Sequence, residues 1–131
     1  MKKCIVIVGM PGSGKTHYGN ALSKENGYPF LDDITPSNKF QTLLEISNMN
    51  QNVILSDVSL CIPEIRDQAA NILHSLGYEI EWIFFEKNAE KCVRNVERRA
   101  DNRFVLPSIH VLERLYEIPE GVNARLIWDG D

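Results

Sequence analysis

Long apolar runs are missing from this sequence of 131 residues. The run after Met1-Lys2-Lys3, from Cys4 to Val8, holds five apolar residues, far fewer than the ~18 that a membrane-spanning helix needs. The same run is too short for the apolar core of a secretory signal peptide. We therefore expect no membrane partner, and we interpret Cys4 to Val8 as the first strand of the fold.

Cysteine and histidine are scarce, and neither shows the spacing of metal ligands. The three cysteines, Cys4, Cys61 and Cys92, are odd in number, which does not suit a disulfide framework. The three histidines share no spacing. These absences favour reduced thiols in a cytoplasmic protein.

An excess of positive charge is also absent. The net charge of −4 argues against binding nucleic acid by bulk electrostatic attraction. The basic residues are unevenly spread, because six of the fourteen lysines and arginines lie between Lys87 and Arg103. A local basic site on an acidic body is therefore compatible with the sequence. No repeat, linker or low-complexity segment divides the chain, so we expect one domain, residues 1–131.

What the sequence does contain is a glycine-rich motif, GMPGSGKT, from Gly9 to Thr16. It matches the pattern GxxxxGK[ST] at every fixed position, and it follows the apolar run and precedes a helical pattern. Backbone N–H groups in such a strand-turn-helix converge on an anion. An ordinary glycine-rich turn is the alternative, and the complete match in this context disfavours it. We expect Gly12, Ser13 and Gly14 to cradle the phosphates of a nucleoside triphosphate.

Lys15 and Thr16 supply the side-chain chemistry of this motif. Lys15 is expected to reach the β- and γ-phosphates, and the Thr16 hydroxyl is expected to ligate Mg²⁺. The Lys15 ammonium is expected at the surface of an empty anion site, where its removal costs little packing. ATP and Mg²⁺ are the cofactors that the motif implies.

Strand and helix patterns alternate along the whole chain. Strands are expected at residues 4–8, 27–32, 53–57, 80–85 and 122–128, with helices that begin near residues 15, 36, 63, 89 and 107. This order predicts a three-layer α/β/α fold with a five-stranded parallel sheet. Ligands of such sheets collect at the carboxyl ends of the strands. That rule gathers the glycine-rich motif, Asp32, Asp33 and Asp57 at one rim.

The aspartates at this rim are candidates for two roles. Asp57 ends an apolar strand, where a carboxylate can serve Mg²⁺, although an ordinary helix-capping or turn aspartate is the alternative. Asp32 or Asp33, at the end of the second expected strand, is a candidate for the general base that takes a proton from an acceptor hydroxyl. Its alternative is turn chemistry, because aspartate before Thr-Pro is common in turns.

Arginines in the second half of the chain suit the transition state of phosphoryl transfer. Guanidinium groups bind phosphoryl oxygens in a bidentate manner. Arg94 and Arg98 are four residues apart and so share one face of a helix. The alternative is a solvated basic face paired with Glu90, Glu97 and Asp101.

Together these motifs resemble the P-loop kinase superfamily, and within it the kinase domain of phage-type polynucleotide 5′-hydroxyl kinases. GMPGSGKT is shared by many small-molecule kinases, so it does not discriminate. Val53 to Leu60 is similar to the family's third strand and the pattern that ends it, and Arg94 to Arg98 to its lid arginines spaced RNxxR. Leu106 to Tyr116 resembles the helix after the lid. The resemblance covers nearly the whole chain and implies a P-loop NTPase fold with a helical lid at about residues 94–106.

The resemblance also implies roles for particular residues. It assigns the general base to Asp32 and the transition-state cations to Arg94 and Arg98, of which Arg98 would also contact ATP. The implied acceptor is the 5′ end of a single-stranded nucleic acid, and a phage protein in a bacterial host would fit. Two positions depart from the family's acceptor site: Thr35 stands where the family has an arginine, and Val58 where it has a threonine.

Other functions stay open on the sequence alone. A nucleoside monophosphate kinase is disfavoured, because residues 33–52 contain no arginine and one lysine, Lys39, to hold an acceptor phosphate. A kinase acting on a nucleoside, nucleotide or sugar fits the donor motifs equally well. A non-catalytic ATP-binding module fits the departures at Thr35 and Val58, whereas a GTP switch is disfavoured because no NKxD-like segment is present.

Overall fold

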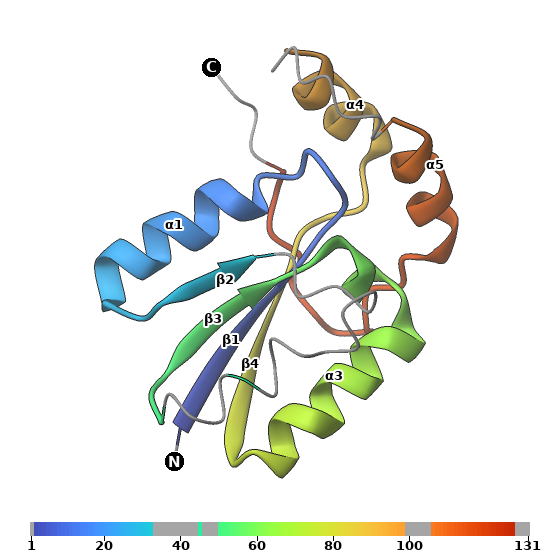
Figure 1. Cartoon of the computed structure of the whole chain (residues 1–131). Coiled ribbons are helices and arrows are strands. Elements are labelled where there is room, and N and C mark those ends of the chain that lie inside the picture. Colours follow the sequence, from blue (N-terminus) through green and yellow to red (C-terminus); the bar gives the residue numbers. More distant parts are fainter. Residues whose placement is uncertain (1, 33–44, 46–49, 99–105, 128–131) are drawn as a thin grey trace.

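The computed structural model describes residues 2–32, 45, 50–98 and 106–127. Within these residues, four parallel strands and their helices form an α/β fold (Figure 1). Several sequence-based predictions lie outside the described residues. They are the helix from residue 36 and the roles or pairings considered for Asp33, Thr35, Lys39 and Asp101.

The sheet has the strand order β2-β3-β1-β4, and all neighbouring pairs are parallel. The strands are β1 (Lys2–Val8), β2 (Phe30–Asp32), β3 (Val53–Ser56) and β4 (Tyr78–Phe84). β1 lies between β3 and β4. Residues 4–8 and all of β3 are buried, as expected for apolar strands covered on both faces.

α1 (Lys15–Asn26) and α3 (Pro63–Ser75) cover opposite faces of the sheet (Figure 1). In the strand order of the sheet, β2 lies on one side of β1, and β4 lies on the other side of β3. The β1–α1–β2 and β3–α3–β4 connections therefore run in opposite directions. Because such connections are right-handed, their helices lie on opposite faces of the sheet. Both helices end next to a glycine, and the strand expected from residue 27 begins only at Phe30. Gly27 and Gly77 adopt left-handed φ angles of 75° and 88°. The predicted three-layer architecture is confirmed.

α4 (Ala89–Arg98) and α5 (Leu106–Leu115) lie next to each other beyond β4 in the chain (Figure 1). Asn88 caps α4, because its Oδ1 accepts a hydrogen bond from the Lys91 N–H at 3.1 Å. Cys92 and Val96 of α4 share the main hydrophobic core with Ile109 of α5. The predicted lid thus begins on a packed helix, and residues 99–105 lie outside the described part.

The prediction of a fifth strand at residues 122–128 is wrong for the described residues of this segment. A single parallel bridge joins Arg125 to Phe85. The Arg125 N–H donates to Phe84 O at 2.6 Å, and Arg125 O accepts from the Glu86 N–H at 2.8 Å. Val122 and Leu126 are exposed and Ile127 is buried in the main core, so the described part of this segment is held by one bridge and one apolar side chain rather than as a strand.

A buried tyrosine joins the end of α5 to the sheet. Tyr116 is 1% exposed, and its hydroxyl donates to Phe85 O at 2.5 Å. Cys4, Cys61 and Cys92 are free and buried, as expected for thiols that pack as small apolar groups. None of the helices described here has the length and apolar character needed to cross a membrane.

Candidate active site

The glycine-rich motif forms the loop between β1 and α1 at the carboxyl end of β1. Gly12 and Gly14 adopt left-handed φ angles of 85° and 100°, which glycine adopts without the strain of a side chain. The Ser13 N–H donates to Met10 O at 3.1 Å and closes a turn within the loop. Gly14 is also the N-cap of α1, so the loop ends at the positive end of the helix dipole. The loop thus leads to the positive end of the α1 dipole, which favours an anion.

Lys15 occupies a different environment from the one we expected. Its side chain is 7% exposed rather than at the surface, and Nζ donates to Met10 O at 3.1 Å. Burial lowers the pKa of the Lys15 ammonium, while Cys61 and Asp32 oppose that shift. The side chain has folded back into the loop because Met10 O offers an acceptor there. A buried cation therefore lies within the predicted phosphate cradle.

Thr16 and Asp32 are brought together by the crossover from α1 to β2. The Thr16 hydroxyl donates to Asp32 Oδ2 at 2.8 Å. Thr16 begins the first turn of α1 and Asp32 ends β2, so the contact joins two elements at the rim. The predicted metal-ligating hydroxyl and the predicted general base thus form one exposed cluster.

Asp57 follows β3 at the same rim and is buried, with 1% exposure. Its Oδ1 accepts hydrogen bonds from the Ser59 N–H at 2.8 Å and the Ser59 hydroxyl at 2.7 Å. This caps the short 3₁₀ helix η2 (Val58–Cys61), so the capping role weighed as an alternative is present. Asp57 also acts electrostatically on Lys15. Its role toward magnesium stays a prediction.

Helix α4 packs directly at Gly12 on the glycine-rich loop of residues 9–14, called the phosphate loop here for its predicted role. A Cβ atom at Gly12 would lie 2.5 Å from Cys92 O and 3.0 Å from Val96 Cγ2. Asn95 Nδ2 donates to Gly12 O at 2.9 Å. Our sequence analysis missed Asn95, although its place beside Val96 in the apolar pattern of α4 is a signal for a buried polar contact.

Arg94 and Arg98 lie on this same helix, and both are exposed. The structure therefore holds the helix that carries them against the phosphate loop. It does not by itself bring their guanidinium groups to the place of the phosphates. Val58, the described position that departs from the acceptor site of the family, begins η2 and is partly buried.

Comparison with known proteins gives one relative by sequence and several by fold. No family model matches the chain. The uncharacterised protein R277 of Acanthamoeba polyphaga mimivirus is 30% identical over 105 residues, covering 78% of this chain and 76% of the viral protein. The chain belongs to the same family as this mimivirus protein.

Several solved structures share the fold of this chain. A gluconokinase from Sinorhizobium meliloti matches with a TM-score of 0.66 at 17% identity, covering 95% of this chain and 80% of the kinase. A sugar kinase from a Janibacter species matches with a TM-score of 0.69 at 16% identity, with coverages of 97% and 84%. The Mycobacterium tuberculosis APS kinase matches at 0.63 and 16%, with coverages of 95% and 87%. The fold is that of P-loop kinases.

Arg125 is a second residue that sequence analysis missed near this site. Its guanidinium lies 4.0 Å from the centroid of the Tyr18 ring in α1. Tyr18 also packs edge-to-face on Phe85, with ring centroids 6.0 Å apart. No local pattern signals this contact, because it depends on the bridge that brings the end of the chain to β4.

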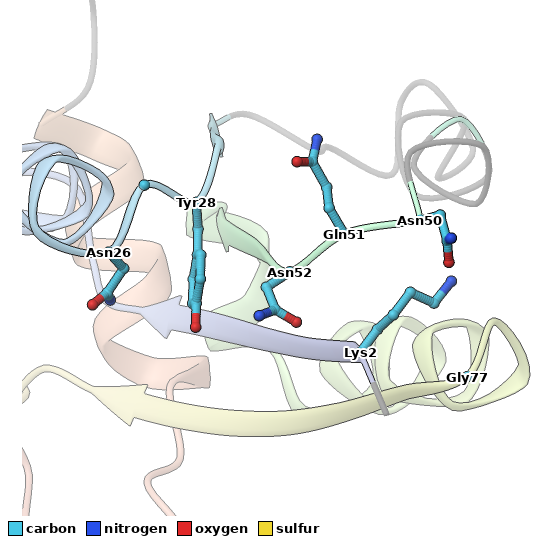
Figure 2. Close-up of a pocket in the computed structure, with 8 residues that line it drawn as sticks. Lys2, Asn26, Tyr28, Asn50, Gln51, Asn52 and Gly77 are labelled. Carbon is cyan, nitrogen blue, oxygen red and sulfur yellow. The ribbon is translucent and has the colours of Figure 1, made fainter.

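A separate polar cavity of about 730 Å³ lies at the opposite end of the sheet (Figure 2). Figure 2 shows the Lys2 side chain pointing toward Asn50, with Asn26 and Tyr28 farther along the cavity. The cavity adjoins the carboxyl ends of α1 and α3, where the helix dipole disfavours anions. It is therefore a poor site for phosphate and stands apart from the candidate active site.

Proposed function

We propose that this chain is an ATP- and Mg²⁺-dependent kinase that moves the γ-phosphoryl group to a hydroxyl of a small-molecule acceptor. The observation that carries this proposal is the 2.8 Å hydrogen bond between the Thr16 hydroxyl and Asp32 Oδ2. It joins the phosphate loop to a carboxylate that can take a proton, and a nucleotide-binding module needs no such carboxylate. Residues 1–131 would act as one P-loop kinase domain.

Recognition of the triphosphate would use the loop and Lys15. Backbone N–H groups of the loop offer hydrogen bonds to phosphate oxygens. Lys15 now donates to a neutral carbonyl in a buried position, with a lowered pKa. Phosphate oxygens would give this ammonium the opposite charge that Met10 O does not provide, and would raise its pKa again.

The donor set at the rim suits magnesium. Thr16 offers a hydroxyl oxygen and Asp57 a carboxylate oxygen, and hard oxygen donors are the ligands Mg²⁺ prefers. Magnesium, when bound, would neutralise charge on the phosphates. The protein's own part is to hold Thr16 at the start of α1 and Asp57 at the end of β3.

Asp32 would act on the acceptor hydroxyl, and the arginines of α4 would act on the phosphoryl group that is transferred. Asp32 would accept the proton of the acceptor hydroxyl as the oxygen attacks, since its carboxylate is exposed at the rim. Arg94 and Arg98 would stabilise charge on the transferring phosphoryl oxygens. The packing of α4 on Gly12 supports this role, because it keeps their helix beside the loop.

Two classes of acceptor are considered, a small molecule and the 5′ end of a polynucleotide. By their titles, the similar structures are a gluconokinase, a sugar kinase and an APS kinase, which favours a small molecule. The sequences Val53 to Leu60 and Arg94 to Arg98 favour instead the 5′-hydroxyl end of a polynucleotide. We place the small molecule first, because Val58 departs from the polynucleotide pattern at the acceptor side.

Transfer of radiolabelled γ-phosphate from ATP to an acceptor panel tests the proposal. The panel holds sugars, sugar acids, nucleosides, nucleotides and 5′-hydroxyl oligonucleotides. Label in a small molecule supports our proposal, and label in the oligonucleotide supports the second candidate. ATP binding without transfer to any acceptor would leave a nucleotide-binding module, and the kinase proposal would be wrong.

A further inference from the structure

The peptide unit between Gly12 and Ser13 is held at both ends. Its carbonyl oxygen accepts from Asn95 Nδ2 at 2.9 Å, and its N–H donates to Met10 O at 3.1 Å. A trans peptide is planar, with the C=O and N–H bonds on opposite sides. Two hydrogen bonds on opposite sides therefore fix the orientation of the whole unit within the loop.

The same network reaches the lysine of the loop. Met10 O accepts both the Ser13 N–H and Lys15 Nζ, each at 3.1 Å. A continuous series of hydrogen-bonded groups thus runs from Asn95 in α4, through the Gly12–Ser13 peptide, to the Lys15 ammonium. It links two segments that are 83 positions apart in the chain.

The contact at Asn95 is tightly packed as well as hydrogen-bonded. Asn95 is 8% exposed, between the exposed Arg94 and the buried Val96. The space beside Gly12 is filled by the Cys92 carbonyl and the Val96 side chain. A buried amide donor in such a place stabilises one arrangement of the loop, because an unpaired Gly12 carbonyl would carry a desolvation cost.

We propose that Asn95 is a positioning residue that couples α4 to the phosphate loop. The inference rests on the proposed function for its catalytic meaning. When Lys15 leaves Met10 O for a triphosphate, the bonds of the Gly12–Ser13 peptide to Asn95 and Met10 keep the loop in shape. The same contact sets where α4, with Arg94 and Arg98, lies relative to the phosphates.

The experiment compares Asn95→Ala with Asn88→Ala. Asn95→Ala removes the donor to Gly12 O, whereas Asn88→Ala removes the cap of the same helix and leaves the loop contact intact. The first readout is the hydrogen-exchange rate of the Ser13 amide, which needs no nucleotide. The second is the dissociation constant of a non-hydrolysable ATP analogue with Mg²⁺, and the third is kcat against KM for ATP.

We expect the Ser13 amide to exchange about tenfold faster in Asn95→Ala, in line with the loss of one buried hydrogen bond. Exchange in Asn88→Ala should stay within about twofold of the parent at a similar melting temperature. Analogue affinity should fall about fivefold to tenfold in Asn95→Ala alone. Equal exchange rates in the two variants would overturn the inference, because a merely weakened helix would explain both.

Asn95→Asp gives a test that does not depend on how well the alanine variant folds. A buried carboxyl beside a carbonyl has a raised pKa, and only its protonated form can donate to Gly12 O. Protection of the Ser13 amide, relative to the parent at the same pH, should therefore recover as pH falls from 8 to 5. Relative protection that stays unchanged over this range would contradict the inference.

These readouts separate this inference from the proposed function. Loss of Ser13 protection in a protein that transfers no phosphoryl group would keep the coupling and reject the kinase. Unchanged protection and affinity in an active Asn95→Ala enzyme would keep the kinase and reject the coupling.

Discussion

The burial of the Lys15 side chain determines how substitutions at this position should affect stability. The ammonium is buried against a single carbonyl, and its lowered pKa reports the cost of that burial. Its aliphatic stem packs in the same place. Removal of the charge and removal of the stem should therefore affect stability in opposite directions.

We predict that Lys15→Met lowers phosphoryl transfer by about 10²-fold or more, because the charge aimed at the triphosphate is lost. Its melting temperature should equal or exceed that of the parent, since methionine fills the space without a buried charge. Lys15→Ala should be equally inactive and melt lower, because it leaves a cavity. Turnover near the parental rate in Lys15→Met would reject the assignment of the phosphate loop. Turnover and thermal melting of the three proteins provide the check.

At the scale of elements, α4 joins a buried contact with the loop to an exposed pair of arginines. Asn95 packs inward on Gly12, while Arg94 and Arg98 face solvent on the same ten-residue helix. An exposed pair of arginines can form a solvated helix face, or it can bind the phosphoryl group of a substrate. A substitution that keeps the charge distinguishes the two.

We predict that Arg98→Lys lowers kcat by about 10²-fold and changes ATP affinity little. Lysine keeps the positive charge and loses the planar fork that matches phosphoryl oxygens. Arg114→Lys, at an exposed arginine of α5, is the matched control and should leave kcat unchanged. Small and equal effects at both positions would show that α4 presents only a solvated face. Steady-state kinetics and equilibrium ATP binding make the comparison.

Local signals predicted most elements because each signal acts within one turn or strand. α3 begins at Pro63 and α4 at Ala89, where the sequence predicts helices to begin. The sequence also predicted that the glycine-rich motif and Asp32 lie at one rim, because the carboxyl ends of parallel strands meet there. The hydrogen bond between Thr16 and Asp32 agrees with this prediction. Contacts that depend on packing between distant segments were missed. The burial of Lys15 is one example. The contact of Asn95 with Gly12 is another, although a polar residue within the apolar pattern of α4 is a local signal for it.

At the scale of the whole molecule, the predicted parallel sheet is present, with four strands among the described residues where the sequence predicts five. In the described part of the last segment, Arg125 makes one bridge and Ile127 packs in the core, while Val122 and Leu126 are exposed. The buried thiols also belong to this scale, since they lie in the core that all elements share. Because these thiols are buried, the stability of the folded protein should change with pH in the alkaline range.

We predict that the protein loses stability above about pH 9. Burial raises the pKa of Cys4 and of Cys61 from 9.0 to about 12, and that of Cys92 to about 11. Above pH 9 the unfolded chain releases these protons and the folded chain keeps them. Stability therefore falls from pH 9 towards those folded values, by up to about 1.4 kcal/mol per pH unit for each thiol.

The lowered pKa of Lys15 acts in the opposite direction, whereas burial also raises the pKa of Tyr78 and of Tyr116 and so adds to the loss above about pH 10. Urea unfolding at pH 8 and pH 10.5 under reducing conditions measures the loss. Between pH 8 and pH 10.5, the free energy of unfolding should fall less in Cys4→Ala than in the parent. This holds whatever the stability of the variant at pH 8. An equal loss in both proteins would contradict the assignment of Cys4.

The most direct test of the central claim is the rate of γ-phosphoryl transfer to an accepted hydroxyl by the parent and by Asp32→Asn. Asparagine keeps the shape of Asp32 and can still accept from Thr16, but it cannot take up a proton from the acceptor. We predict that the parent transfers label, and that Asp32→Asn binds ATP equally well and transfers at least about 10²-fold more slowly. Asp67→Asn, at an exposed aspartate of α3, should match the parent. Absence of transfer by the parent, or equal rates in the parent and Asp32→Asn, would contradict the claim that Thr16 and Asp32 belong to one phosphoryl-transfer site.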